Sequence, residues 1–415
     1  MRTPAILATY WFAALAALGV FFPLFSLYLS ENLGLRGYEI GFVTAAIPLT
    51  GLLAQPFWGA LADRSGSRVR ILALLTAGAA AGYTNLAQQD NFVSVLFATF
   101  ALALFSTSVM PMAVSVSLAL LRERGRHAFG MVRSVGTLGY LVAVSGFPWL
   151  LHHLGEAAPV VGPAAASATE PRLGMMLWVT AALMATASIV ALALPRTGAV
   201  ALRADAGDWR TLLHNGPYLR LLGVTLLLYV FLQGPLVMFP MYVRSLGGGL
   251  DDVSRMWMWM LAFEIPLLAG IAAAPARVGA RELIGLGIAA DAMRWLVSGL
   301  SANLAVISVV QVLHGLAVAG FVVGSALYVE AVVPARLRSS AQGLVYMVGV
   351  SFGGMISSIA AGALLEGWGP RAPAVVGGAG AALLVVALPW LLPTVQRHPH
   401  DDTVAMEAAD ERPCV

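Results

Sequence analysis

Long apolar runs separated by short polar connections extend along nearly the whole chain. A helix that crosses a bilayer needs about 20 mostly apolar residues. Runs of sufficient length lie near 5–29, 39–62, 69–88, 92–121, 128–151, 173–194, 217–243, 254–275, 282–300, 302–332, 340–364 and 372–393. The first run is too long for a signal peptide, and further runs follow it. The pattern therefore predicts twelve transmembrane helices.

The composition agrees with this pattern and excludes several classes of protein. Hydrophobic residues make up 59% of the chain and charged residues only 11%, with a mean hydropathy of +0.82, whereas soluble domains have about a quarter charged residues. We predict an all-α integral membrane protein that lies in a lipid bilayer and binds no nucleic acid. The single cysteine, Cys414, excludes an intrachain disulfide and a multi-cysteine metal site. We expect neither a metal nor a cofactor.

The arginines set the expected orientation. If the N-terminus is inside, 17 of the 24 basic residues lie on the inner side, 5 on the outer side and 2 within spans. Basic residues accumulate on the cytoplasmic side of membrane proteins. We therefore expect a multi-pass protein of the plasma (inner) membrane, bacterial in origin, with both termini in the cytoplasm.

The spans fall into two groups of six. A shift of 213 residues aligns Arg64, Gly66 and Arg68 with Arg277, Gly279 and Arg281, and it aligns Ala128, Gly130, Val132 and Gly136 with Ala341, Gly343, Val345 and Gly349. Six is an even number, so the two copies keep the same orientation, as in parallel-repeat transporters. We predict an N-terminal half (1–194), a cytoplasmic linker (195–216), a C-terminal half (217–393) and a cytoplasmic tail (394–415). One chain then forms the whole path for a solute between its halves and can function as a monomer.

Several stretches resemble a known family. The segment GALADRSGSR, residues 59–68, resembles the G-x-L-x-D-R-x-G-x-R loop of the major facilitator superfamily. Residues 10–29, 129–140, 263–267 and 313–344 resemble the branch of that superfamily that contains phenylpropionate permease-like and nucleoside symporter-like proteins. The resemblance implies the major facilitator fold and a secondary transporter, usually driven by protons, that imports a small organic solute by alternating access. It also implies that helices 1, 4, 7 and 10 border the cavity.

The 59–68 loop is expected to act as a hinge and a latch. Gly59 allows close helix packing, Gly66 allows a positive φ in the turn, and Arg64 and Arg68 hold the turn on the inner side. The second copy departs from the signature, because Ala276 stands where Asp63 does.

We expect Asp63 to interact with the other half when the protein opens outward. Ser339 and Gln342 have the spacing of a capping box at the start of helix 11. The amides of a helix N-terminus attract an acid, and Arg336 and Arg338 lie close by in the sequence.

Four ionisable residues fall within the spans or at their edges, where a charge is costly and often functional. They are Arg133, Glu264, Asp291 and Arg294. Glu264 is a candidate for carrying a proton as the cavity alternates between wet and dry, and a structural hydrogen bond is the alternative. Asp291 and Arg294 are three residues apart and can form an ion pair on one helix face. A proton relay through this pair is the minor alternative.

Polar and aromatic residues at helical spacing are candidates for binding the solute. Arg133, Thr137 and Tyr140 share one face of helix 5, and Trp257 shares the face of Glu264. A longer stripe on helix 10 contains Gln311, His314, Phe321, Ser325 and Tyr328, and helix 7 adds Tyr229 and Gln233. Such mixed faces are typical of solute-binding walls, although polar side chains also join helices within membranes.

These observations predict a proton-coupled importer of an aromatic acid, a nucleoside or a sugar-like compound. A proton-antiport exporter of drugs or metabolites is the second possibility, although helix 5 lacks the G-x-x-x-G-P-x-x-G-G signature of many exporters in the superfamily. A transport-dead membrane receptor is the third. We find no phosphate loop, no metal-ligand spacing and no nucleophile with a base, so an enzyme is not expected.

Overall fold

The computed structural model describes residues 2–122, 125–154, 160, 162–195, 208–273 and 278–395. These residues form helices and turns, and they contain no strand. The long helices before the middle of the chain are α1 (Arg2–Phe21), α3 (Gly37–Ser65), α4 (Arg68–Leu86), α5 (Phe92–Leu120), α6 (Gly125–Leu154) and α7 (Met175–Leu192), with the short α2 (Phe25–Glu31) and η3 (Ala165–Ser167).

The rest of the chain continues in the same way. Its helices are α8 (Asp208–Leu213), α9 (Gly216–Ser245), α10 (Leu250–Ala273), α11 (Ala280–Leu300), α12 (Leu304–Val310), α13 (Leu313–Val332), η4 (Ala335–Leu337), α14 (Arg338–Tyr346), η5 (Met347–Gly353), α15 (Gly354–Trp368) and α16 (Ala372–Leu391). Residues 196–207 of the predicted linker, residues 396–415 of the predicted tail, and Ala276 and Arg277 lie outside the described residues.

Ten helical runs among the described residues are long and apolar enough to cross a membrane. The two other long helices, α4 with 19 residues and α10 with 24, lie in the same bundle. Each of the twelve predicted spans therefore coincides with a long helical run. The all-helical membrane architecture is confirmed, and the full count of twelve crossings stays a prediction.

Three predicted spans are interrupted, and the sequence explains one of these interruptions. Pro23 lacks an N–H group and separates α1 from α2, which leaves the Phe22 side chain at the break. In the predicted span 302–332, α12 ends at Val310 and α13 begins at Leu313. In the predicted span 340–364, α14 passes into the π-helical segment η5 before α15 begins. π-Helical turns are rare and often occur at functional sites.

The helices pack in two groups. α1 packs on α6 and α7, α4 on α5 and α7, and α3 on α5, whereas α9 packs on α15 and α16, and α11 on α13 and α16. Contacts between these two groups run through α3 and α15, α6 and α10, and α2 and α9. The proposed boundaries of the halves, at residues 194 and 217, stay a prediction.

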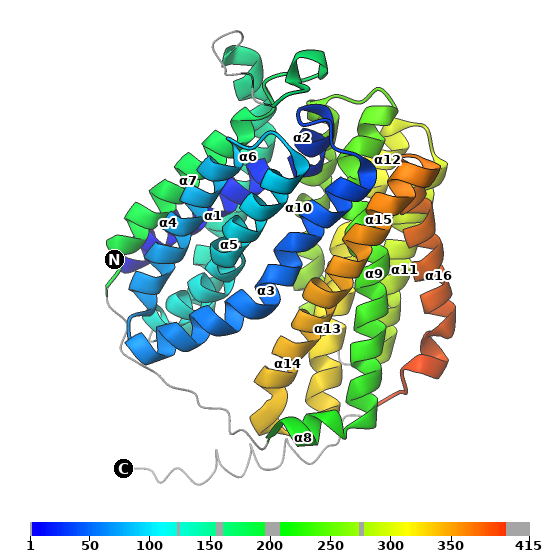
Figure 1. Cartoon of the computed structure of the whole chain (residues 1–415). Coiled ribbons are helices and arrows are strands. Elements are labelled where there is room, and N and C mark those ends of the chain that lie inside the picture. The colour runs from blue at the N-terminus through cyan, green and yellow to red at the C-terminus, as the bar shows by residue number, and fades with distance from the viewer. Residues whose placement is uncertain are drawn as a thin grey trace.

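The two ends of the bundle differ in how its helices meet. We call the end with Arg64, Arg68, Arg336 and Arg338 the arginine-rich end, and the end with α2 the opposite end. Figure 1 shows α3 and α15 side by side near the opposite end, while α3 and α14 diverge toward the arginine-rich end. A methyl group on Gly362 would overlap the backbone carbonyl of Gly37, and one on Gly41 would overlap that of Ser358. Glycine therefore permits the close approach of α3 and α15.

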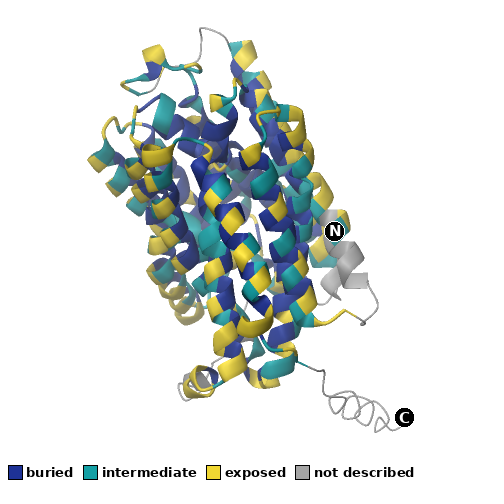
Figure 2. Cartoon of the chain, turned by 90° about the vertical axis from the view of Figure 1, so that its right-hand side faces the viewer, coloured by how far each residue is buried: buried dark blue, intermediate teal, exposed yellow. Residues whose placement is uncertain are grey.

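Large apolar side chains cover much of the outside of the bundle. Leu53, Ile189 and Leu383 each have at least 70% of their surface exposed, and Figure 2 shows exposed positions along the outer faces of the helices. Soluble proteins rarely expose such extended apolar surfaces. The exterior therefore suits contact with lipid.

Candidate functional site

One polar cluster lies between α1, α6 and α10. On α6, Arg133 Nη1 lies 3.4 Å from the Thr137 hydroxyl, to which it donates. Its guanidinium carbon lies 4.8 Å from the centre of the Trp11 ring of α1. Glu264 of α10 is close enough to interact electrostatically with Arg133 and with Tyr140. The fold thus brings together two ionisable residues that are 131 positions apart in the sequence.

Aromatic rings continue this cluster. The Trp257 ring of α10 lies 6.2 Å from the ring of Tyr140 and 5.5 Å, edge-on, from the ring of Phe22. The Tyr140 hydroxyl and the Trp257 indole nitrogen are buried and have no hydrogen-bond partner among the described residues. Buried donors normally have a partner, so these two unpaired groups set the cluster apart from ordinary helix packing. We call Trp11, Phe22, Arg133, Thr137, Tyr140, Trp257 and Glu264 the α6–α10 cluster.

A cavity of about 270 Å³ adjoins this cluster. Phe22 belongs to both, because its side chain lines the cavity and contacts Trp257. The lining residues come from both groups of helices: Leu18, Phe21, Phe22, Phe25, Ser26, Thr44, Ile47, Pro48, Gly51, Gln55, Tyr83, Leu102, Ser106, Thr107, Met110, Pro111, Gln233, Val237, Tyr346, Val350, Ser351 and Ser358. None of them carries a full charge at neutral pH. An apolar wall with a few hydrogen-bonding groups is typical of sites for small molecules.

The two helix 7 candidates, both on α9, separate in the structure. Gln233 lines the cavity. Tyr229 instead packs beside Gly349 and Gly353 of η5, where an added methyl group would meet its side chain, and its ring lies 5.9 Å from that of Phe321. Glycine at these two positions therefore permits η5 to pack closely on α9.

The residues of the predicted stripe on helix 10 contact several different neighbouring segments. Gln311 donates to Ser298 at 3.1 Å, and His314 Nδ1 lies 3.0 Å from Arg294 Nη1. Ser325 lies 3.4 Å from the Gln342 amide that donates to it, and the Tyr328 hydroxyl donates to the Pro393 carbonyl at 3.1 Å. These contacts favour the alternative in which the stripe joins helices, since none of its five residues lines the cavity described above.

Asp291 and Arg294 form an ion pair inside the second group of helices. Arg294 Nη2 lies 2.9 Å from Asp291 Oδ1, and both side chains are fully buried. The guanidinium also lies 4.1 Å from the centre of the Trp295 ring. The pair packs between α11 and α13, because His314 contacts it, and this position suits the structural interpretation.

The 59–68 loop differs from the expectation in two places. Gly66 has the predicted positive φ, of 62°. Gly59 faces open space, so its predicted role in close packing is wrong. Leu337 takes the cap position of α14, and Gln342 bonds to Ser325, so the predicted capping box of Ser339 and Gln342 is also wrong. A 3₁₀ turn, η4, leads into α14, whose cap lies two residues earlier than predicted.

The charged residues of this end make local contacts. Asp63 pairs with Arg68 of its own loop at 2.8 Å. Arg338 donates to the Glu330 carbonyl at the end of α13, while Arg64 and Arg336 lie at exposed positions. The contact of Asp63 with the start of α14 was predicted for an outward-open arrangement and stays a prediction.

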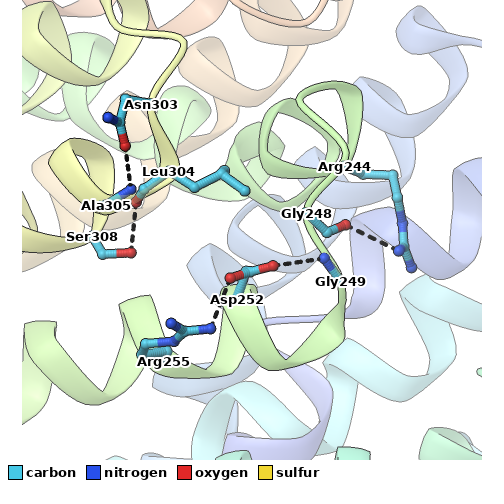
Figure 3. A network of polar contacts seen from close by, with 9 residues as sticks. All are labelled: Arg244, Gly248, Gly249, Asp252, Arg255, Asn303, Leu304, Ala305 and Ser308. Atoms are coloured by element: carbon cyan, nitrogen blue, oxygen red, sulfur yellow. Dashed lines mark hydrogen bonds and ion pairs between the residues drawn. The ribbon is translucent and has the colours of Figure 1, made fainter.

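The opposite end is joined by contacts that we did not predict. The Glu31 carboxylate of α2 lies 2.8 Å from Arg244 Nε of α9. The Gly37 amide of α3 donates to the Glu366 carboxylate of α15 at 2.7 Å. Figure 3 shows that Arg244 also donates to the Gly248 carbonyl, at 3.1 Å, which fixes it to the turn before α10.

Comparison with known proteins places this geometry in a family. The model of the MFS_1 like family matches residues 5–372. The chain belongs to this family. The predicted resemblance to major facilitator transporters is therefore confirmed.

Relatives of this MFS_1 like protein include transporters from bacteria. The maltose permease of Geobacillus stearothermophilus is 28% identical over 365 residues, which are 86% of this chain and 87% of the relative. The putative nucleoside transporter YegT of Escherichia coli (strain K12) is 25% identical over 382 residues, or 88% and 85% of the two chains. The chain is thus a multi-pass membrane protein from a family of transporters.

Solved structures show the same fold at low sequence identity. The nucleoside transporter NupG superimposes with a TM-score of 0.80 at 18% identity and covers 94% of this chain and 99% of that one. The xylose transporter XylE from E. coli, in an inward open conformation, gives 0.72 at 11% identity and covers 97% and 98%. These similarities confirm the major facilitator fold of the MFS_1 like chain.

Proposed function

We propose that the chain is a proton-coupled secondary transporter that imports a small organic solute by alternating access. The observation that carries this proposal is the position of Glu264 and Arg133. They lie on α10 and α6, where the two groups of helices meet. A carboxyl group whose neighbouring cation lies across this interface interacts with that cation differently in the two arrangements of the helices. Its affinity for a proton therefore differs between them, which is what coupling a proton to their movement requires.

The cavity suggests the class of solute. Its lining residues carry no full charge, so no lining side chain offers a positive charge to an anion. Gln55 and Gln233 supply amides from the two groups of helices, and aromatic rings such as Phe22 and Tyr83 supply flat apolar surfaces. This lining favours an uncharged, hydroxyl-bearing compound, such as a nucleoside or a sugar, over an aromatic acid. The relatives that transport maltose or nucleosides support the same choice.

The proposal also includes an orientation in the membrane and a movement of the two halves. The arginine-rich end is placed in the cytoplasm together with both termini, in accordance with the positive-inside rule. The halves 1–194 and 217–393 would then rock about the cavity. The ion pair of Glu31 with Arg244 holds the outer end closed in the arrangement described, while α3 and α14 diverge at the inner end. A single chain provides the whole path, so a monomer suffices.

Uptake into proteoliposomes tests this function. A labelled panel of nucleosides, small sugars and aromatic acids is offered with and without an imposed pH gradient. We expect accumulation of a nucleoside or a sugar above its external concentration only with the gradient, acid outside. Equal accumulation of the transported compound without the gradient would exclude proton coupling, and efflux driven by the same gradient would favour the exporter.

A further inference from the structure

Trp11 of α1 is held in a fixed position by residues from two other helices. Its side chain is fully buried, and its indole N–H donates to the Ser117 hydroxyl of α5 at 2.9 Å. The Phe129 ring of α6 meets it edge-on at 6.3 Å. A ring with both a hydrogen bond and an edge contact has little freedom to rotate. Trp11 therefore forms a rigid surface on α1.

Arg133 lies against this surface. Its guanidinium carbon is 4.8 Å from the centre of the Trp11 ring, within the roughly 6 Å over which a cation is attracted to an aromatic face. Its hydrogen bond to Thr137 is long, at 3.4 Å. A cation–π contact is stronger where the cation is removed from water. The Trp11 ring is thus a major support of the guanidinium.

Two glycines allow this contact to form. A methyl group on Gly136 would meet the Leu15 side chain and the Trp11 carbonyl, and one on Gly139 would overlap the Phe12 carbonyl. The backbones of α6 and α1 therefore approach closely at these positions. Arg133 precedes Gly136 by three residues, about one helical turn, which places it level with Trp11.

We infer that Trp11 is a positioning residue, which holds the Arg133 guanidinium toward Glu264, and that the Ser117 hydroxyl fixes the orientation of its ring. This inference rests on the proposed role of Glu264. The groups that face Glu264 and bear on its charge are Arg133 and Tyr140 of α6. α13 presents Gly315 there, and its neighbour His314 contacts Arg294 instead. Arg133 is therefore the cation through which Trp11 acts.

Infrared titration of the purified full-length protein in detergent tests this inference without a known solute. The carboxyl band that disappears in Glu264→Gln identifies the Glu264 signal, and its midpoint pH is measured in each variant. Arg133→Gln defines the midpoint without the cation. We expect Trp11→Leu to move the midpoint by about one pH unit toward that of Arg133→Gln, since one unit corresponds to 1.36 kcal/mol. Trp11→Phe and Ser117→Ala should move it less, in the same direction.

A double-mutant cycle separates positioning from simple packing. In the Arg133→Gln background, Trp11→Leu should cause no further shift, because neighbouring residues that act through one contact are not additive. Trp58→Leu is the matched control: this tryptophan is also buried and its indole donates to the Leu104 carbonyl at 2.8 Å. We expect the Glu264 midpoint in Trp58→Leu to equal that in the native protein. If Trp11→Leu does not fold, Trp11→Phe and Ser117→Ala provide the same comparison.

Different results would overturn different statements. A native midpoint in folded Trp11→Leu, or in Trp11→Phe and Ser117→Ala together, contradicts the positioning role but leaves the role of Glu264 intact. The absence of any band that Glu264→Gln removes contradicts the proposed coupling itself. A native midpoint in Arg133→Gln contradicts the pairing of Arg133 with Glu264, and the positioning role with it.

Discussion

Glu31 and Arg244 form an ion pair of 2.8 Å that joins α2 to α9 at the opposite end of the bundle. Only 13% of the Glu31 side chain and 17% of the Arg244 side chain are exposed. Removing one partner of such a partly buried pair costs more stability than removing one partner of a surface pair, because the remaining charge stays desolvated. This pair is the strongest candidate for a lock at the opposite end.

Removing the guanidinium should therefore open this end. Arg244→Gln is expected to increase the distance between spin labels attached at positions 88 and 368, which lie at the ends of α4 and α15, in a background in which Cys414 is replaced by serine. Pulsed electron paramagnetic resonance measures the distance distribution. Arg255→Gln is the matched control, since Arg255 pairs with Asp252 of its own helix at 2.8 Å (Figure 3). An equal effect of both substitutions would contradict the lock.

The same end should respond to pH through Glu170. Burial raises the pKa of the Glu170 carboxyl; Arg244 opposes this shift, Glu31 adds to it, and His152 and Asp251 act in smaller measure in opposite senses. A raised pKa means that the closed arrangement binds the proton more tightly than an arrangement in which Glu170 is solvated. The stability that this proton adds is present at low pH and is lost as the pH rises through the raised pKa.

We therefore expect the closed population, measured with the same labels, to fall as the pH is raised above the ordinary range of a glutamate. Glu170→Gln mimics the protonated form and should keep this end closed without dependence on pH in that range. An unchanged pH dependence in Glu170→Gln would show that another group is responsible.

The glycines of η5 provide a test of packing against α9. A methyl group on Gly353 would lie 2.7 Å from Tyr229 Cβ and 3.0 Å from the Leu226 carbonyl. Overpacking of this kind costs about 1–3 kcal/mol, so Gly353→Ala should lower the melting temperature in detergent. Gly343→Ala, at a position with no atom within 4 Å of the added methyl group, should leave it unchanged. Equal melting temperatures for the two variants would contradict the packing.

The pair of Asp291 with Arg294 tests a structural role against a proton relay. Removing one partner of a buried ion pair costs about 3–5 kcal/mol, whereas replacing both by apolar residues often costs little. Asp291→Ala is therefore expected to lower the melting temperature strongly, and the double variant Asp291→Leu with Arg294→Met should recover most of it. A stable Asp291→Ala protein that transports its solute but no longer accumulates it would favour the relay instead.

Much of the fold follows from the sequence because the bilayer imposes a simple rule. Backbone polar groups must be satisfied within the membrane, so long apolar runs form helices. Each run from 5–29 to 372–393 coincides with a helix or with consecutive helical segments. The π-helical turn η5 could not be predicted in this way. It depends on how Gly349 and Gly353 pack on Tyr229 of another helix, and an apolar pattern carries no such information.

The site was predicted only where a residue stands out by its chemistry. Arg133, Trp257 and Glu264 are exceptional within apolar runs, and the fold brings them together. Gln55 and Thr107, which line the cavity, resemble many other polar residues at the helix surfaces, so no local signal distinguished them. On helix 10 the spacing left two interpretations open, because a stripe of period 3.6 cannot tell whether a neighbouring helix or a cavity faces it. Ser325 and Tyr328 bond to neighbouring segments.

Proton-driven accumulation by Glu264→Gln in proteoliposomes tests the central claim most directly. The solute is the compound of the panel that the native protein accumulates, and Glu282→Gln is the control, because Glu282 is half exposed and pairs with the adjacent Arg281. We expect Glu264→Gln to exchange labelled for unlabelled solute across the membrane but to accumulate none above its external concentration under a pH gradient, while Glu282→Gln behaves like the native protein. Full gradient-driven accumulation by Glu264→Gln would contradict the proposed coupling.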